Sequence, residues 1–577
     1  MSTQEIPHWL DRYANNAHAW TFSISDNGQC HFKRPLGLVE TSFDTDGIYY
    51  GGRADITAIF RLEIRHALSK DDLRKRIATA WTLLRLRHVL LMSRTAKDMP
   101  SGKKHFVVDV PTSTEEAVED VEKSMTWLED HGFDECIDDL DLKHHALNVG
   151  RIIQPSQCLS KLHVLPLMRS AKGGSTYTLR FLIVIAHQIS DGLAAYNWFS
   201  DFLSILNTPL SAMYSQIATA IQVSELQARL PCAQEDLYPR ITGSRARQRW
   251  FWAIMRVLRH HVQHTMPRTF ANPLRRAKRL TGAIPLPPRY ASVFDYTPSV
   301  LPPMSTAHIA ATLSLAASAR LMALCRSIHV SIGAGCFALV ALSMMTMHAE
   351  RDPHGTTAPF PPAMGASFPL NPRPFLASNP PADSCMLAFS EGIVMPFLPL
   401  SLPIEARFRL VAKHANRELR VYQKRAREKH TGLGDFDKYS PARLLAAGYM
   451  AQIERAEDKL PETKKKGGST PQGILSANKA KYEATCGVSS VGSLKAYFRP
   501  GEHDLGDETK DFVADYRGLN MGVRARENEF LIGSSTDPNG HVGFKVSYDE
   551  NAISQEVAQK WADTICGLLE PGKAARL

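Results

Sequence analysis

Apolar residues along the chain follow patterns that predict alternating strands and helices. Residues 55–65 form a β-leaning stretch, and the helix expected to begin at Ser69 carries apolar residues at three- and four-residue spacing. Residues 177–186 form a nearly continuous apolar run with β-branched residues at its end, which is typical of a strand buried on both faces. Helical spacing then returns from Gly192 to Leu206.

The second half of the chain shows a similar alternation after a less regular stretch. We expect helices at 316–327, 404–422 and 552–569, a buried helix within 328–347, and strands near 485–498, 529–535 and 541–548. The chain has 577 residues, which is too long for one hydrophobic core. We therefore predict an α/β protein with an N-terminal lobe (1–207), a basic crossover (208–304) and a C-terminal lobe (305–577).

The composition is that of a globular protein, with 44% hydrophobic and 22% charged residues. The formal charge of +10 is concentrated in residues 245–279, where Trp250, Phe251 and Trp252 lie among arginines. This segment could be an amphipathic helix on an acidic or membrane surface, or it could attract an anionic cosubstrate. We favour a solvated crossover, because runs of charge are usually solvated, and we expect no nucleic acid as a partner.

The cysteines and the chain start place the protein in a reducing setting. Nine scattered cysteines include no Cys-x-x-Cys pair and none grouped with histidine, so we expect neither a disulfide framework nor a metal. The first residues lack the pattern of a signal peptide. The longest nearly apolar run, 332–347, is shorter than a membrane span, so we expect no transmembrane segment and a cytoplasmic protein.

The strongest candidate for chemistry is His187, which follows the apolar strand directly. Histidine suits general-base catalysis because its ordinary pKa lies near neutrality. Asp191, four residues later, could orient the imidazole as the carboxylate of a triad, or it could be structural and point away; we favour the structural role. Gly192 follows in a turn between strand and helix, where glycine permits a tight backbone.

His187-x-x-x-Asp191-Gly192 resembles the signature of the acyltransferase superfamily related to chloramphenicol acetyltransferase. That superfamily includes BAHD acyltransferases, peptide-synthetase condensation domains and fungal alcohol acetyltransferases. The full-length pattern resembles most the fungal trichothecene 15-O-acetyltransferase type, whose members act in secondary metabolism and mycotoxin formation. The resemblance implies two chloramphenicol acetyltransferase-like lobes with a central tunnel.

Two further segments resemble the same superfamily. Residues 365–374 are similar to its Asn-x-Arg segment, which implies that Asn371 and Arg373 support the site and that Arg373 pairs with Asp191. Residues 488–492 are similar to a late strand beside the tunnel, which makes Ser489 and Ser490 candidates for contacts with the oxyanion or substrate. The chain departs from the pattern at Ala186, where many condensation domains have a second histidine, and it lacks the Asp-Phe-Gly-Trp motif of BAHD enzymes.

By this resemblance the protein is an O-acyltransferase, with acetyl transfer expected. Acyl-CoA, expected to be acetyl-CoA, would be a cosubstrate rather than a resident cofactor. The acceptor would be a terpenoid or polyketide alcohol, His187 would act as the base, and no covalent intermediate would form. We expect a monomer.

Three other functions stay open. A free-standing condensation-like enzyme would take its acyl group from a carrier protein, and a catalytically silent scaffold would not need His187. A binding protein for membranes or nucleic acids would use residues 245–279. A serine hydrolase is not indicated, because Gly-x-Ser-x-Gly does not occur, and the phosphate-loop and dinucleotide motifs are also missing.

Overall fold

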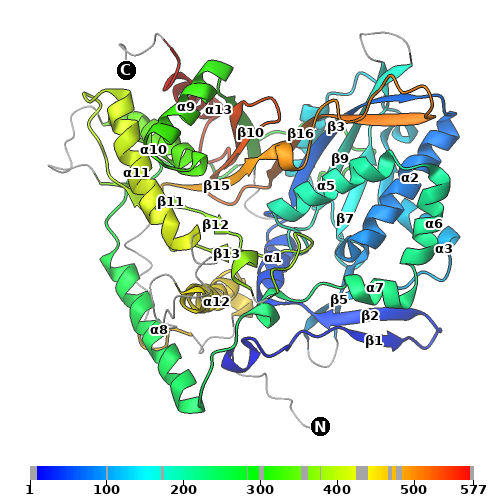
Figure 1. Cartoon of the computed structure of the whole chain (residues 1–577), viewed down its shortest axis with the longest axis horizontal. Coiled ribbons are helices and arrows are strands. Elements are labelled where there is room, and N and C mark those ends of the chain that lie inside the picture. The colour runs from blue at the N-terminus through cyan, green and yellow to red at the C-terminus, as the bar shows by residue number, and fades with distance from the viewer. Residues whose placement is uncertain are drawn as a thin grey trace.

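The protein has two lobes, each built around a six-stranded sheet (Figure 1). The computed structural model describes residues 9–98, 102–169, 175–282, 284–297, 305–352, 362–376, 378–423, 440–465, 471–475 and 484–571. Each lobe has its own large hydrophobic core. The predicted α/β class with two lobes is therefore confirmed.

The sheet of the N-terminal lobe has the strand order β16-β3-β9-β7-β6, and β8 also pairs with β9. These strands are β3 (Ile56–His66), β6 (Met125–Trp127), β7 (Ser160–Val164), β8 (Met168–Arg169), β9 (Thr176–Ile185) and β16 (Phe512–Val523). Strand β9, which the apolar run predicted, is hydrogen-bonded to β3 on one side and to β7 on the other. It therefore lies in the middle of the sheet, and its end delivers the chain to His187.

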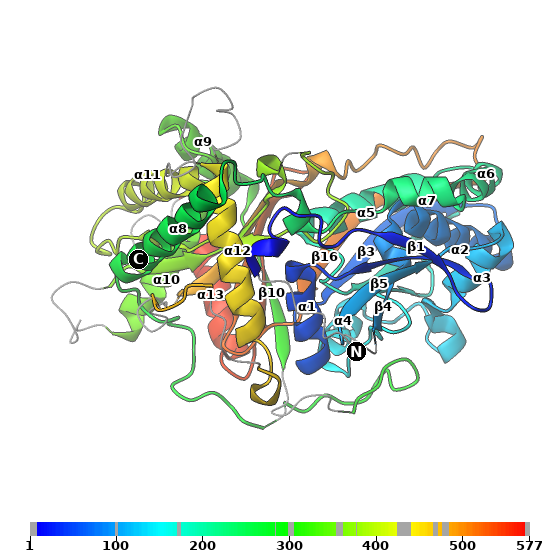
Figure 2. The same ribbon diagram turned by 90° about the horizontal axis from the view of Figure 1, so that it is seen from below.

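Helices cover this sheet, and a smaller sheet lies beside it (Figures 1 and 2). The helices are α2 (Lys70–Arg87), α3 (Thr114–Glu122), α4 (Asp139–Asn148) and α5 (Gly192–Leu206). The smaller sheet has the order β1 (Thr21–Ile24), β2 (Cys30–Pro35), β5 (Lys104–Asp109) and β4 (Arg94–Lys97). Helix α2 begins where the sequence predicted, because the Ser69 side chain accepts a hydrogen bond from the Asp72 amide.

The sheet of the C-terminal lobe has the order β10-β18-β17-β15-β11-β14. Its strands are β10 (Thr306–Thr312), β11 (Met364–Ser367), β14 (Ile393–Met395), β15 (Cys486–Ser493), β17 (Phe530–Thr536) and β18 (Val542–Asp549). Its helices are α9 (Leu315–Ser327), α10 (Ile332–Arg351), α11 (Ile404–Gln423), α12 (Pro441–Asp458) and α13 (Gln555–Gly567). A short ladder, β12 (Pro369–Leu370) with β13 (Ala388–Phe389), lies apart from the main sheet.

Helix α10 is the central helix of the C-terminal lobe. It packs against α9, α11, α13 and β15. By length and composition it could cross a membrane, but 78% of its most apolar window is buried inside the protein. A core helix of a soluble domain has these same properties, and the expected buried helix is found here.

Strand β16 joins the two lobes and departs from the predicted organisation. Its residues fall within 305–577, the range predicted for the C-terminal lobe, yet β16 pairs along its whole length with β3 of the N-terminal lobe. The preceding Leu494 and Phe498 also pack in the N-terminal core. The predicted lobe boundary is wrong for this stretch, because strand pairing over such a sequence separation leaves no local signal.

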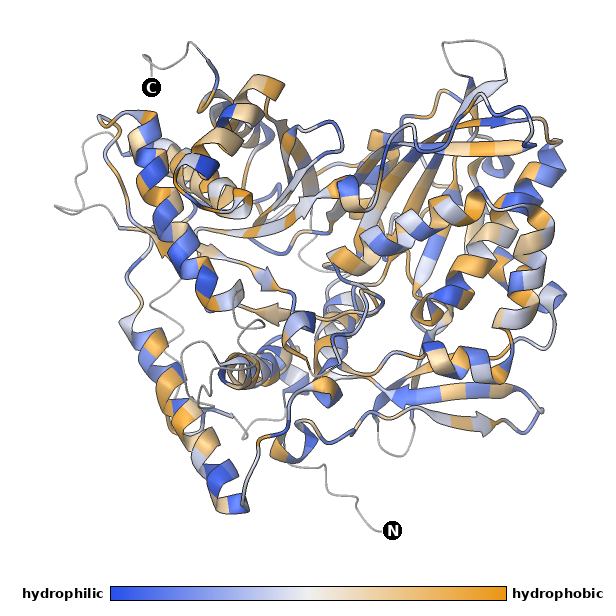
Figure 3. Ribbon diagram, viewed as in Figure 1, coloured by the Kyte–Doolittle hydropathy of each residue, from blue (hydrophilic) through white to orange (hydrophobic). Residues whose placement is uncertain are grey.

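The predicted crossover is more regular than expected, since its described residues, 208–282 and 284–297, contain three α-helices. They are α6 (Leu210–Ala220), α7 (Val223–Arg229) and α8 (Arg245–Thr265). Apolar and polar residues alternate along α8 (Figure 3). Its Phe251, Trp252 and Met255 pack in a cluster with α12, whereas Trp250 is 65% exposed. Helix α8 is thus half docked and half solvated.

The side chain of Asn207 forms hydrogen bonds with the backbone of β16, at the edge of the sheet. Its amide donates to the Ala514 carbonyl at 2.9 Å and accepts from the Ala514 amide at 2.8 Å. We predict that Asn207→Ala lowers the free energy of unfolding by about 1–3 kcal/mol, because a backbone donor and acceptor lose their partners. Urea denaturation measures this change, and Asn207→Ala as stable as the wild type would contradict it.

Candidate active site at the lobe boundary

His187 lies in the turn that links β9 to α5. The turn is closed by hydrogen bonds from the Ile189 amide to the Ala186 carbonyl and from the Ser190 amide to the His187 carbonyl. The imidazole is partly exposed and stacks on Phe43 of α1 (Leu38–Tyr49), with ring centroids 3.9 Å apart and planes 14° apart. Helix α1 lies between the lobes in both views (Figures 1 and 2). His187 therefore lies at the boundary between the lobes.

The surroundings of His187 favour its neutral form. Burial lowers the pKa of the imidazole to about 4, and the positive charge of Arg526 acts in the same direction. A hydrogen bond to its own backbone and the charges of Asp191 and Asp55 oppose this shift but do not cancel it. The ring is consequently neutral near pH 7 and has a lone pair with which to accept a proton.

Asp191 is the N-cap of α5 and not a partner of His187. Its Oδ1 accepts hydrogen bonds from the amides of Leu193 at 2.9 Å and Ala194 at 3.0 Å. Its Oδ2 accepts from Arg373 Nη2 at 2.7 Å and from the Met386 amide at 3.0 Å. These four bonds occupy the carboxylate, which agrees with the structural role favoured from the sequence.

Arg373 of the C-terminal lobe forms an ion pair with Asp191, as the resemblance implied. Besides Asp191, its guanidinium donates to the carbonyls of Pro381 at 3.1 Å and Ser384 at 2.7 Å. Asn371 Oδ1 accepts from the Arg373 backbone amide at 3.1 Å and from its Nη1 at 3.2 Å. Asn371 therefore orients the arginine that holds Asp191.

Residues 381–386 of the C-terminal lobe form a loop in which several residues contact the N-terminal lobe. The Ala382 carbonyl accepts from Asn197 Nδ2 at 3.2 Å, and Asp383 accepts from Trp198 Nε1 at 2.9 Å. Cys385 places its Sγ 3.9 Å from Nδ1 of His187. The loop thus connects Asp191, α5 and the imidazole.

His88 forms a second connection that the sequence did not reveal. Its Nδ1 lies 2.5 Å from Asp383 and its Nε2 lies 2.9 Å from Asp201, so the ring bridges two carboxylates from different lobes. Burial lowers the pKa of His88, but the two carboxylates outweigh it and the net shift is upward. Nothing in the local sequence singles out this histidine, which follows helix α2 directly.

The remaining predicted site residues are Gly192, Ser489 and Ser490. A Cβ added to Gly192 would meet nothing within 4 Å, so packing does not require glycine at this turn. The Ser489 carbonyl accepts from Ser534, and the Ser490 hydroxyl lies 3.5 Å from where a Cβ on Gly333 would stand, facing α10. Neither serine contacts His187 in the part of the chain that the structure describes.

No group of three or more His, Cys, Asp or Glu side chains suited to a metal ion occurs among the described residues. His260 and His264 lie next to each other on α8, with ring centroids 3.9 Å apart, and within the described ranges they belong to no such group. All nine cysteines are free thiols.

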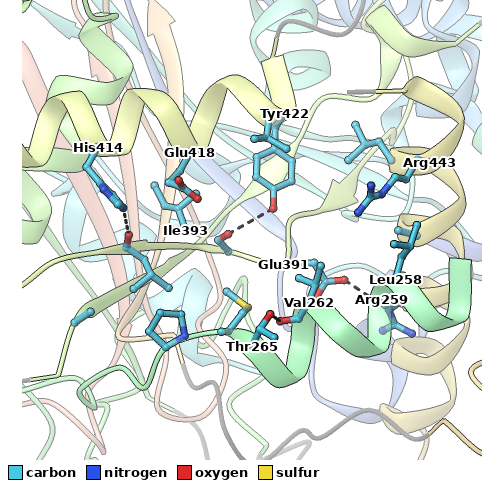
Figure 4. Close-up of a pocket in the computed structure, with 18 of the residues that line it drawn as sticks. Leu258, Arg259, Val262, Thr265, Glu391, Ile393, His414, Glu418, Tyr422 and Arg443 are labelled. Atoms are coloured by element: carbon cyan, nitrogen blue, oxygen red, sulfur yellow. Dashed lines mark hydrogen bonds and ion pairs between the residues drawn. The ribbon is translucent and has the colours of Figure 1, made fainter. Parts of the chain in front are cut away.

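A separate cavity of about 580 Å³ lies in the C-terminal lobe, between α8, α11, α12 and β14 (Figure 4). Its polar groups are bonded to one another, as His414 donates to the Val394 carbonyl at 2.8 Å and Arg259 lies 3.6 Å from Glu391. Its lining includes no residue of the His187 turn. The cavity is therefore distinct from the candidate active site.

Comparisons with known proteins place this geometry in a known fold. No family model and no curated protein matches the sequence. The structure is similar to that of TRI3 trichothecene 15-O-acetyltransferase from Fusarium sporotrichioides, with a TM-score of 0.64 over 97% of this chain and 98% of that one, at 11% identity. The chain has the fold of that acetyltransferase.

The same fold occurs in condensation domains. The first condensation domain of the calcium-dependent antibiotic synthetase matches with a TM-score of 0.52 over 96% of this chain and 98% of that chain, at 11% identity. The condensation domain of the monacolin K polyketide synthase MokA matches with a TM-score of 0.50 over 93% and 96%, also at 11% identity. The similarity spans both lobes, so these condensation domains share the fold of this chain.

The Arg373–Asp191 pair can be tested by its coupling. We predict that Arg373→Gln lowers the free energy of unfolding by about 3–5 kcal/mol, because a buried carboxylate loses its cation. Asp191→Asn should be destabilising too, and the double variant should lose less than the two single losses combined. Urea denaturation of the four proteins measures this, and strictly additive losses would contradict the coupling.

His88 makes stability depend on pH. Because its pKa is raised in the folded protein, charged His88 contributes stability that is fully present below the ordinary value of 6.5 and is lost as pH rises through the folded value. We predict that the melting temperature of the wild type exceeds that of His88→Gln by more at pH 6 than at pH 9. An equal difference at both pH values would contradict a charged His88.

Proposed function

We propose that this protein is an acyltransferase that moves an acyl group, expected to be acetyl, from acyl-CoA to a hydroxyl group of a secondary metabolite such as a terpenoid or polyketide alcohol. The observation that carries the proposal is the neutral, partly exposed imidazole of His187 at the lobe boundary. Its turn is anchored by Asp191, Arg373 and the loop 381–386. The shared fold with an O-acetyltransferase supports it.

The imidazole would act through Nε2. Only Nδ1 can reach the carbonyl of its own residue, and Nδ1 also faces Cys385, so the lone pair of the neutral ring is on Nε2. Nε2 takes the proton of the acceptor hydroxyl while the oxygen attacks the thioester carbonyl. The tetrahedral intermediate then expels the coenzyme A thiolate, which recovers the proton from His187, leaving ester and free thiol. Ser489 and Ser490 stay the candidates for stabilising the oxyanion.

A condensation-like reaction is the alternative, because condensation domains share the fold over both lobes. The same imidazole would then act on an acyl group carried by a carrier protein. Turnover with a carrier-bound thioester but not with the coenzyme A thioester would identify this function. A silent scaffold would retain its cellular role without His187.

We predict that His187→Ala lowers acetyl-CoA-dependent acylation of a responsive alcohol by about 10²–10⁴-fold, because general-base assistance is lost. Free thiol release from acetyl-CoA, measured across a panel of terpenoid and polyketide alcohols, reports the rate. His261→Ala, which removes an exposed histidine on α8, is the matched control and should behave as the wild type. Alcohol-dependent release that survives His187→Ala would refute the role of His187.

The pH profile of the same reaction tests the environment of the ring. A base whose pKa is about 4 stays neutral down to about pH 5.5, so kcat/KM should be flat from pH 8 to 5.5. An imidazole with the ordinary pKa of about 6.5 would retain roughly one tenth of its base form at pH 5.5. A tenfold loss at that pH would therefore contradict a base with a lowered pKa.

A further inference from the structure

Three cations, Lys459, Arg526 and Arg455, gather beside the candidate active site, near the carboxylates of Asp46 and Glu529. Lys459, at the end of α12, contacts the carboxylate of Asp46 on α1 and donates to Ser42 Oγ at 2.9 Å. Arg526, in the loop after β16, donates to the same Asp46 carboxylate at 2.6 Å. Arg455 precedes Lys459 by four residues on α12, so the two side chains share one face of the helix.

Arg455 has no carboxylate of its own. Its guanidinium carbon lies over the ring of Phe389 of β13, 3.8 Å from the ring centroid, and Arg455 forms no ion pair with any residue that the structure describes. Burial, with Arg526 nearby, lowers the pKa of Arg455 to about 10 and that of Lys459 to about 7. Asp46 and Glu529 supply two negative charges against these three basic groups, and Arg455 is the one that pairs with neither among the described residues.

This cluster is close to His187. The Phe43 ring stacks 3.9 Å from the imidazole, and Lys459 Nζ lies 5.1 Å from the same ring, so the ammonium is within about 9 Å of the imidazole centroid. Leu387 and Phe389 pack against the buried Phe43 in one apolar cluster. His187, Leu387, Phe389, Arg455, Lys459 and Arg526 are all partly exposed. Each of these side chains therefore has surface open to contact with a ligand.

We propose that the acceptor is an apolar molecule bearing a carboxylate, which binds Arg455 with help from Lys459 and Arg526 while its hydroxyl reaches His187. This inference rests on the acyl transfer proposed above. The planar guanidinium can bind a carboxylate through two parallel hydrogen bonds, and stacking on Phe389 holds it ready to do so. The apolar body of the acceptor lies along Leu387 and Phe389.

The anion belongs to the acceptor and not to coenzyme A. The thiol of coenzyme A is separated from its diphosphate by a pantetheine arm that extends to about 16 Å. The thioester must lie at His187, and Lys459 is within about 9 Å of that imidazole. The cations are therefore too near the reacting centre for the diphosphate of an extended cosubstrate.

Binding of simple probes to the full chain tests the subsite without turnover. By calorimetry, the wild type should bind decanoate more tightly than decanamide, and Arg455→Gln should weaken decanoate binding by about tenfold or more while leaving decanamide binding unchanged. Arg249→Gln removes an exposed arginine of α8 and should match the wild type. Arg455→Lys keeps the positive charge but not the planar guanidinium, so it should lose less decanoate affinity than Arg455→Gln. Melting curves check that each variant is folded.

Equal binding of decanoate and decanamide by the wild type overturns the proposal, as does a loss that both Arg455→Gln and Arg249→Gln share. Weaker binding of free coenzyme A, with decanoate unaffected by Arg455→Gln, assigns the cations to the cosubstrate and also overturns it. In turnover with acetyl-CoA, Arg455→Gln should weaken the apparent affinity for the acceptor 6-hydroxyhexanoate, whose ends are about 8 Å apart, about tenfold and leave that for 1,6-hexanediol unchanged. Decanoate binding that depends on Arg455 without thiol release for any alcohol would keep the subsite and reject the acyl transfer.

Discussion

The carboxylate of Asp191 is the contact on which the rest of the site depends. One oxygen caps α5 within the N-terminal lobe, and the other accepts from Arg373 and Met386 of the C-terminal lobe. A buried carboxylate costs several kcal/mol to desolvate unless it is paired and hydrogen-bonded. The second oxygen of Asp191 therefore has its partners only when the two lobes are docked, so the interface contributes to the position of the turn that presents His187.

Features with a local periodic pattern could be predicted closely. The helix expected at 404–422 is α11 (Ile404–Gln423), because its Phe408, Val411, Ala415 and Leu419 form one stripe that the core buries. The apolar run before His187 is strand β9, since a strand in mid-sheet is apolar on both faces. The pairing of Arg373 with Asp191 was predicted from the motif resemblance. No local pattern could have predicted it, because the two residues are 182 positions apart.

Features made by distant segments could not be predicted. The three cations near His187 come from α12 and from the loop after β16, and each looks like an ordinary surface charge in the sequence. His88 resembles any polar residue at a helix end until Asp383 from the other lobe is placed against it. Phe43 lies on a helix with no clear apolar stripe, so its stacking on His187 leaves no periodic trace.

The insertion of β16 into the N-terminal sheet also constrains how the protein is made. Strand β3 pairs with β9 on one side and with β16 on the other. Strand β16 is synthesised about 330 residues after the end of β9, so the second edge of β3 has no partner until then. At ribosomal rates of roughly 5–20 residues per second, that edge stays open for about 16–65 seconds on the nascent chain. An open strand edge is a template for pairing with other chains. The emerging first lobe must therefore be shielded during translation, and it cannot be produced as a separate domain with its sheet complete.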